Sequence, residues 1–159
     1  MNSLLVVVQP SADYAGQLQQ AGFEAALVAT PKRAPALSEY PRVVAAELQD
    51  PDAVLAALQR YADQHHLAYG GIVCFVCEYL PLTARLALGL GLPFHSEEAV
   101  RTSRGKGFTA AAWKAAGIPT PASHEVARLE ELLDFAEGHP GPWILKPVDR
   151  SGSEWVLRV

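Results

Sequence analysis

The sequence predicts an α/β fold in which helices cover both faces of a parallel sheet. Two short runs, 4–8 and 71–76, are apolar throughout, which is typical of strands covered on both faces. Between them, residues 51–66 carry apolar side chains at helical spacing. Strands that alternate with helices along a chain form doubly wound parallel sheets. Residues 1–95 are therefore expected to form one small α/β unit.

Each further element of this unit has its own signal. Ser11 is expected to cap a helix at 13–21, which ends before Gly22. Asp50 is expected to cap the next helix, which opens with Pro51 at its first position. The remaining strands are expected at 24–29 and 42–48, the remaining helix at 80–90, and a loop with three prolines at 30–41.

The composition describes an ordinary soluble globular protein. The chain has 159 residues, 50% hydrophobic and 19% charged, and its net charge of -4 gives no reason to expect nucleic acid or an anionic membrane as a partner. The apolar runs are shorter than the roughly 18 to 20 residues of a membrane helix. The run at 4–8 lacks the basic lead-in and cleavage site of an export signal, so we expect a cytoplasmic protein.

Two pairs of residues have both a functional and a structural interpretation. His65 and His66 end a helix, where an imidazole can interact with exposed carbonyls, and we favour this over a catalytic role. Cys74 and Cys77 have the spacing of a redox or metal motif. We favour two buried thiols, because side chains three apart on a strand point to opposite faces and a zinc site needs about four ligands.

A second section, 96–159, is expected to form a partial α+β layer. Its expected helices begin near 96 and span 102–116 and 129–137, and its expected strands are 123–127, 143–146 and 154–159. The last two strands are joined by a turn at 149–153. The last strand leaves an edge unpaired, and such an edge usually pairs with further polypeptide.

Lys146 has the clearest local pattern of a binding residue. It ends a short apolar run and precedes Ser151, Gly152 and Ser153, and backbone N–H groups in such a turn can converge on an anion. The lysine ammonium adds a charge that can reach phosphate oxygens. The alternative is a lysine at a strand end that extends into water.

Two common phosphate motifs are excluded. A dinucleotide-binding turn needs glycines after the first strand, and residues 9–13 contain none. A P-loop at Lys106 would need a glycine at Val100 and a serine or threonine at Gly107.

Three blocks in order, 104–106, 116–121 and 144–153, resemble the entry to an ATP-grasp domain. The preceding residues, 1–95, resemble the Rossmann-like pre-ATP-grasp domain of that family. Residues 96–159 would then open the ATP-grasp domain and form part of its N-terminal lobe. Residues 71–73 and 86–100 resemble the corresponding segments of those family members that join amino acids or similar carboxylates to amines.

The resemblance implies a ligase that uses ATP and Mg2+ to activate a carboxylate as an acyl phosphate, which an amine then displaces. Lys106 and Lys146 match the two lysines that contact the nucleotide phosphates. Ser151, Gly152 and Ser153 match the start of the loop that covers them. The family's magnesium ligands lie in a C-terminal lobe that has no counterpart in this chain, so no metal ligand is assigned. A nucleotide and a small carboxylate or amine are the implied partners, and a homo-oligomer is left open.

Two residues depart from the family pattern, which usually has an acidic residue at Gly105 and a glycine at Trp155. Glu78 is a weaker candidate for ligand binding. It follows the strand at 71–76, at the carboxyl edge where ligands gather in open α/β sheets. The alternative for Glu78 is a solvated carboxylate at a helix start.

These observations support two hypotheses from different classes. The leading one is the N-terminal part of an ATP-grasp carboxylate–amine ligase, which is not expected to complete the reaction alone. The alternative is a non-catalytic, stand-alone α/β binding or interaction module derived from such a protein. A flavodoxin-like or receiver-like domain fits residues 1–95 only.

Overall fold

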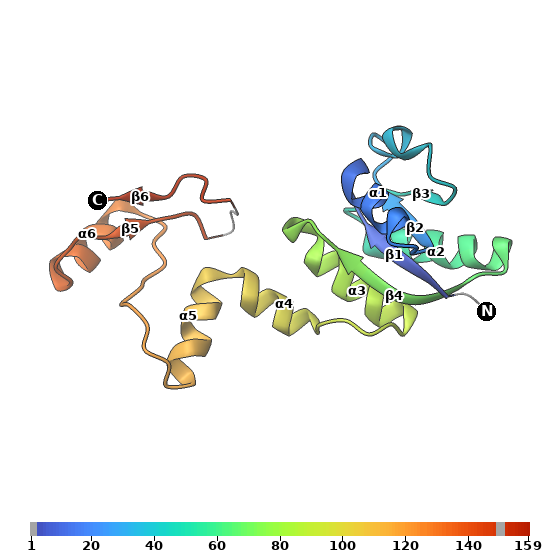
Figure 1. Cartoon of the computed structure of the whole chain (residues 1–159). Helices are drawn as coiled ribbons and strands as arrows, with labels where there is room; N and C mark the ends of the chain where they lie inside the picture. Colours follow the sequence, from blue (N-terminus) through green and yellow to red (C-terminus); the bar gives the residue numbers. More distant parts are fainter. Residues whose placement is uncertain (1–2, 149–151) are drawn as a thin grey trace. The chain divides into compact units, whose positions relative to one another are not determined.

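The computed structural model describes residues 3–148 and 152–159, which form two compact units. The first unit is Met1–Glu97 and the second is Glu98–Val159. In Figure 1, the first unit runs from blue to green and the second from yellow to red. Each unit is considered by itself below.

The first unit is built on a four-stranded sheet with the order β3-β2-β1-β4, and every neighbouring pair is parallel. Its strands are β1 (Ser3–Val8), β2 (Ala25–Ala29), β3 (Val43–Ala45) and β4 (Ala68–Cys74). β1 lies in the interior, with β2 on one side and β4 on the other, so the order of strand addition reverses between β1 and β4. In open α/β sheets such a reversal marks the crevice where ligands bind, at the carboxyl ends of the strands.

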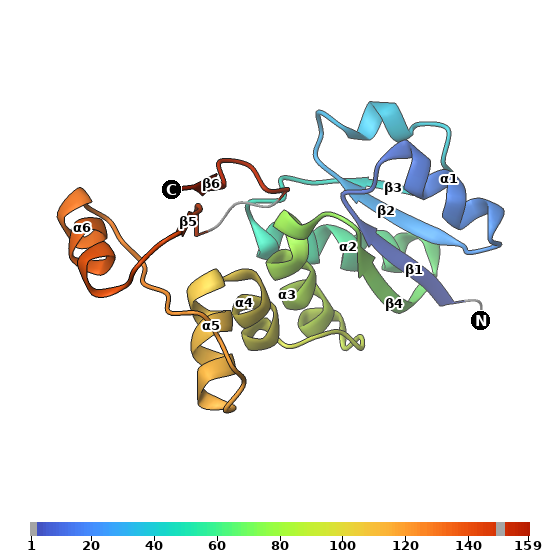
Figure 2. The same cartoon turned by 60° about the vertical axis from the view of Figure 1, so that its left-hand side comes forward.

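Helices cover both faces of this sheet, as the sequence predicts. They are α1 (Ala12–Gln20), α2 (Pro51–His65) and α3 (Leu80–Leu90), with short 3-10 turns η1 (Ala34–Leu37) and η2 (Cys77–Tyr79). Alternate residues of β1 point to opposite sides. Val6 and Val8 pack with α2 and α3, whereas Val7 packs with α1 and η1. Figure 2 shows the sheet between these two layers. Each valine that is fully buried in this way contributes roughly 1.5–3 kcal/mol.

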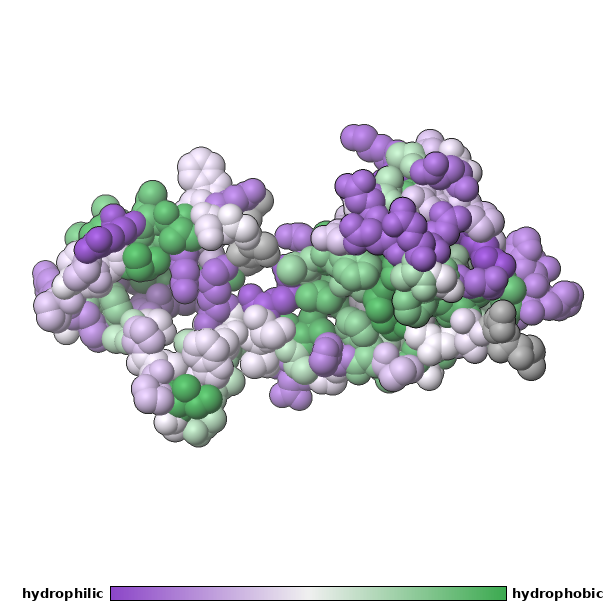
Figure 3. Space-filling view, in the orientation of Figure 1, coloured by the Kyte–Doolittle hydropathy of each residue, from purple (hydrophilic) through white to green (hydrophobic). Residues whose placement is uncertain are grey.

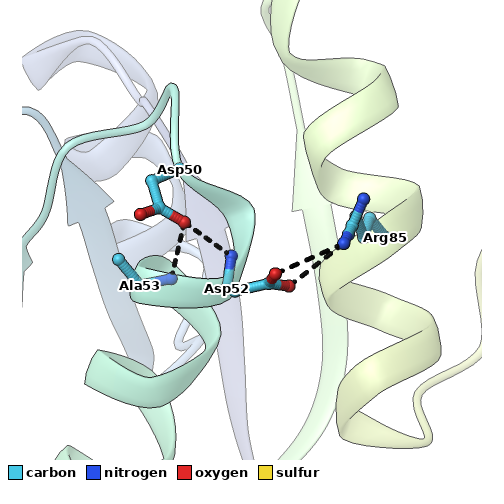
Figure 4. Close-up of polar contacts among 4 residues, drawn as sticks. All are labelled: Asp50, Asp52, Ala53 and Arg85. Carbon is cyan, nitrogen blue, oxygen red and sulfur yellow. Dashed lines mark hydrogen bonds and ion pairs between the residues drawn. The ribbon is translucent and has the colours of Figure 1, made fainter.

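The start of α2 shows how local sequence sets an element boundary. The Asp50 carboxylate accepts hydrogen bonds from the backbone N–H groups of Asp52 and Ala53, at 3.2 and 3.0 Å (Figure 4). These donors have no partner within the helix, so the cap satisfies them. The Asp52 carboxylate in turn pairs with the Arg85 guanidinium of α3 at 3.1 Å. The expected cap and first proline of this helix are therefore confirmed.

The second unit contains short elements. They are α4 (Glu97–Arg104), α5 (Lys106–Ala115), α6 (Leu129–Gly138), β5 (Ile144–Leu145) and β6 (Leu157–Arg158). β5 and β6 form an antiparallel ribbon. Among the described residues, no helix is long and apolar enough to cross a membrane.

Several expected boundaries in both units are wrong. The helix expected at 102–116 is two helices, because Gly105 has extended backbone angles (φ -80, ψ 112) and separates α4 from α5. Residues 123–127 do not form a strand. β3, β5 and β6 are shorter than expected, and β4 ends at Cys74 rather than at residue 76. Apolar runs indicate that a strand exists, but the partner strand decides how much of the run pairs.

The ribbon of the second unit exposes apolar side chains. Ile144, Leu157 and Trp155 are 57%, 53% and 78% exposed, and α6 contains no buried residue. Figure 3 shows green, apolar surface over β5 and β6. A two-stranded ribbon alone is marginally stable in water. Among the described residues, the large core clusters belong to the first unit.

Candidate functional site

Lys106 is the first residue of α5, and it is half-buried. Gly105 is the N-cap and provides no side chain to cap the helix. The first backbone N–H groups of a helix point outwards and favour negative charge. A carboxylate lies near the second residue of α5, because an oxygen of Glu125 is 3.1 Å from the place where a β-carbon on Gly107 would be. The start of α5 therefore combines a lysine with outward-pointing N–H groups.

The backbone of Gly105 is in close contact with an aromatic ring. A β-carbon at position 105 would lie 2.5 Å from Cδ2 of Phe108 and 3.3 Å from the carbonyl oxygen of Arg101. The Arg101 guanidinium lies over the same ring, 4.9 Å from its centroid, in a cation–π contact. The position before Lys106 is thus packed without room for a side chain.

Lys146, Gly152 and Ser153 lie at one end of the β5–β6 ribbon. Lys146 follows β5 directly and is exposed. Gly152 and Ser153 belong to the turn that leads into β6, and both have left-handed backbone angles (φ 72 and 60). Ser151, the third expected residue of this turn, lies outside the described residues.

The far end of the ribbon is closed by two backbone hydrogen bonds between Trp143 and Val159, at 2.8 and 3.0 Å. Lys146 and the turn residues therefore lie at the opposite end of the ribbon from this closure. Lys106 belongs to a different element, α5, so its convergence with Lys146 on one nucleotide is a proposal.

Trp155 occupies a backbone conformation that suits glycine. Its φ is 57, and its side chain is 78% exposed. A non-glycine residue in the left-handed region costs roughly 1–2 kcal/mol. The strain and the exposure together indicate that packing does not dictate a tryptophan at this position.

Glu78 lies in the first unit, exposed within η2 at the carboxyl edge of the sheet. An aromatic pair spans the same edge. Tyr14 of α1 stacks on Phe75, which follows β4, with ring centroids 4.7 Å apart and an interplanar angle of 20°. Both rings are about two-fifths exposed. The pair bridges the ends of β1 and β4, where the order of the sheet reverses.

Sequence reasoning missed this aromatic pair, although a signal was present. Tyr14 and Phe75 each follow an apolar strand closely, and the carboxyl ends of parallel strands meet at one edge. A third residue here is Gln9, which is buried at φ 49, and its side-chain oxygen accepts a hydrogen bond from the N–H of Thr30 at 3.1 Å.

The two cysteines lie at this edge as well. Cys74 ends β4 and Cys77 begins η2, so the argument that a strand holds their side chains on opposite faces is wrong. Burial raises the pKa of the Cys74 thiol, and hydrogen bonds from the backbone of Val76 and the side chain of Thr83 partly offset this effect. The described residues contain no group of three or more His, Cys, Asp or Glu side chains that could hold a metal ion.

Comparisons with known proteins locate the fold. No family model matches the sequence, and no curated protein matches it. Solved structures do match. The L-amino acid ligase from Bacillus licheniformis has a TM-score of 0.75 and 23% identity, and the match covers 99% of this chain and 39% of that protein.

Two further solved structures contain nucleotides. The N5-carboxyaminoimidazole synthetase from Staphylococcus aureus, complexed with ADP, has a TM-score of 0.70 and 13% identity, over 99% of this chain and 41% of that one. The biotin carboxylase domain of the 2-oxoglutarate carboxylase from Hydrogenobacter thermophilus, in complex with MgADP, ADP and bicarbonate, has a TM-score of 0.65 and 18% identity, over 99% and 38%.

These solved structures are ATP-grasp ligases, and this chain has the fold of their N-terminal portion. The resemblance found in the sequence is therefore confirmed at the level of the fold. The chain spans about two-fifths of the length of the proteins it matches, with 39% for the L-amino acid ligase.

Proposed function

We propose that this chain is the N-terminal part of an ATP-dependent carboxylate–amine ligase. Residues 1–95 would be its pre-ATP-grasp domain, and residues 96–159 would open its ATP-grasp domain. The observation that supports this proposal is that 99% of the chain, both units included, matches 39% of an L-amino acid ligase in structure. Nucleotide-bound neighbours with the same fold support the same class.

In this proposal Lys106 and Lys146 bind the phosphates of ATP, and Ser151, Gly152 and Ser153 form the start of a loop over them. The support is local. Lys106 stands at the start of a helix, where anions are favoured, and Lys146 precedes a turn in which Gly152 and Ser153 have left-handed backbone angles. Bound ATP with magnesium would supply the phosphoryl group that activates the carboxylate. The two ammonium groups would hold the phosphates in place and neutralise their charge.

No residue of this chain is assigned to magnesium, because the described residues offer no cluster of metal-binding side chains. Glu78 is proposed as a weaker contact to the bound ligands, from the carboxyl edge of the first unit.

A second candidate function is a non-catalytic binding or interaction module. The packing around Gly105 favours it, because Phe108 and Arg101 leave no room for the acidic residue that the resemblance leads one to expect there. The strained backbone of Trp155 favours it as well. Both residues adjoin the proposed phosphate contacts, so the two candidates differ chiefly in whether ATP binds.

Calorimetric titration of the complete gene product with Mg-ATP, Mg-ADP and adenosine separates the candidates. We expect Mg-ATP to bind, and Lys106→Ala and Lys146→Ala each to weaken it about 10- to 100-fold, because hydrogen bonds to charged groups contribute roughly 1.5–3 kcal/mol. Lys114→Ala is the matched control, since Lys114 is an exposed lysine in the last turn of α5. The affinity for adenosine should be the same in the wild type and in all three variants, because adenosine has no phosphate.

Two results would reject the ligase assignment of these lysines. One is equal Mg-ATP affinity in the wild type and the three variants. The other is the absence of any Mg-ATP binding, which would instead support the interaction module.

A further inference from the structure

The two cysteines lie on either side of a bend at Phe75, at the carboxyl edge of the sheet. Cys74 is the last residue of β4, and its Sγ donates to the carbonyl oxygen of Val76 at 3.1 Å. That carbonyl is bonded to the backbone nitrogen of Cys77. With standard peptide dimensions, the oxygen lies about 2.8 Å from the next Cα, so the Cys74 sulfur is within about 6 Å of the Cys77 Cα.

The two cysteines differ in their surroundings. Burial is the main cause that raises the pKa of the Cys74 thiol, and the charge of Cys77 acts in the same direction. Cys77 itself is exposed, whereas Cys74 is half-buried. The pair therefore consists of an accessible outer thiol and a shielded inner thiol.

The turn tolerates a cross-link without losing a backbone partner. The Val76 carbonyl that accepts from Cys74 also accepts from the N–H of Tyr79 at 3.0 Å. If Cys74 gives up its hydrogen bond, this carbonyl therefore stays satisfied. Disulfide-bonded cysteines usually have Cα atoms about 4.4–6.8 Å apart, a separation that a short turn between them can provide.

We propose that Cys74 and Cys77 are a dithiol pair that closes reversibly into a disulfide by exchange with a small-molecule disulfide such as glutathione disulfide. The Cys77 thiolate attacks one sulfur of glutathione disulfide, whose S–S bond breaks and releases one glutathione thiolate. The Cys74 thiolate then attacks the Cys77 sulfur and releases the second glutathione. The two protein thiols are oxidised by two electrons, glutathione disulfide is reduced by two, and the two thiol protons end on the two glutathione molecules.

Closure would act on the ligand-facing edge of the first unit. Phe75 lies between the two cysteines and stacks on Tyr14, and Glu78 follows Cys77 within η2. A bond across this segment fixes the turn that carries both side chains. The proposal does not depend on ATP binding, so it stands or falls separately from the proposed function.

Incubation of the reduced protein with glutathione disulfide, followed by intact mass measurement, tests the pair. For the wild type we expect a species that is lighter by two hydrogen atoms. Cys74→Ser should stop at a mixed disulfide that carries one glutathionyl group on Cys77. Cys77→Ser should react at least about 10-fold more slowly, because its remaining thiol is shielded and its thiolate is disfavoured. Circular dichroism of each variant verifies that the fold is kept.

Two outcomes would overturn the proposal. The first is a wild type that accumulates glutathionyl groups without the lighter species, which would mean that the sulfurs do not reach each other. The second is equal reaction rates of Cys74→Ser and Cys77→Ser, which would remove the distinction between an outer and an inner thiol. Glutathione redox buffers then give the reduction potential of a pair that passes both tests.

Discussion

The ring of Phe108 lies against the backbone of Gly105, so close that a β-carbon on Gly105 would be 2.5 Å from Cδ2 of the ring. The contact sits at the junction of α4 and α5, directly before Lys106. A substituent at this position must displace an aromatic ring that Arg101 also holds.

Gly105→Ala should therefore destabilise the second unit by about 1–3 kcal/mol, which is the usual cost of overpacking. In a Phe108→Ala background the same change should cost much less, because the ring that obstructs the β-carbon is gone. Urea unfolding of the four proteins in this double-mutant cycle measures the coupling. Equal effects of Gly105→Ala in both backgrounds would contradict the steric explanation.

The difference in stability between two variants of Trp155 tests whether the backbone at this position is strained. Trp155→Gly and Trp155→Ala remove the same exposed ring, but only glycine fits a φ of 57 without strain. The glycine variant should be more stable than the alanine variant by about 1 kcal/mol. At an ordinary backbone angle the order would be reversed. The fluorescence of Trp113 and Trp143, both in the second unit, reports the unfolding.

The start of α2 contains two aspartates with different expected contributions. Asp50→Ala leaves two N–H groups of α2 without their cap and should cost about 1 kcal/mol. Asp52→Ala removes an ion pair whose side chains are 53% and 79% exposed, and it should cost less than about 0.5 kcal/mol. Thermal unfolding at low and high salt provides the comparison. The Asp52 effect should shrink with salt, and a larger loss for Asp52 than for Asp50 would count against the cap.

Tyr69 should make the stability depend on pH in the alkaline range. Its hydroxyl donates to the carbonyl oxygen of Leu58 at 2.8 Å, and burial raises its pKa from 10.0 to about 12. The folded state therefore favours the protonated phenol. Its contribution is fully present below pH 10 and is lost as the pH rises through about 12. Urea unfolding between these values should show a steeper loss for the wild type than for Tyr69→Phe, and parallel curves would refute this assignment.

Hydrogen exchange should differ sharply between the two units. The central strands β1 and β2 pair along four residues and lie under helices on both faces, so their amides should exchange slowly. β5 and β6 pair along two residues only, and their side chains are largely exposed. We expect their amides to exchange many times faster, as in segments with few buried contacts. If the amides of the β5–β6 ribbon and of the sheet were equally protected from exchange, the ribbon would have to be covered in solution.

The sequence predicted the first unit well because its signals are local and strong. The helix expected at 80–90 has those bounds, and Ser11 and Asp50 are the caps that were expected. The helix expected at 102–116 missed the break at Gly105, whose backbone is extended and lies against the ring of Phe108. The strand expected at 123–127 is absent because no neighbouring strand pairs with it among the described residues.

The site was predictable only in part. The sequence predicts a phosphate site at Lys146 and the turn after it, and both lie at the same end of the ribbon. The stack of Tyr14 on Phe75 needs two segments that lie 61 positions apart, and only the sheet topology joins them. The position of Glu125 beside the first turn of α5 has no local signal at all.

The side-chain amide of Gln9 connects the loop after β1 to the loop after β2. Its left-handed backbone turns the chain sharply after β1, and its side chain holds Thr30, the first residue after β2. This hydrogen bond restricts the motion of the two loops relative to each other. A molecule that binds at this edge of the sheet would therefore contact loops that are already ordered. The entropy cost of ordering these loops is incurred when the chain folds and not when the molecule binds.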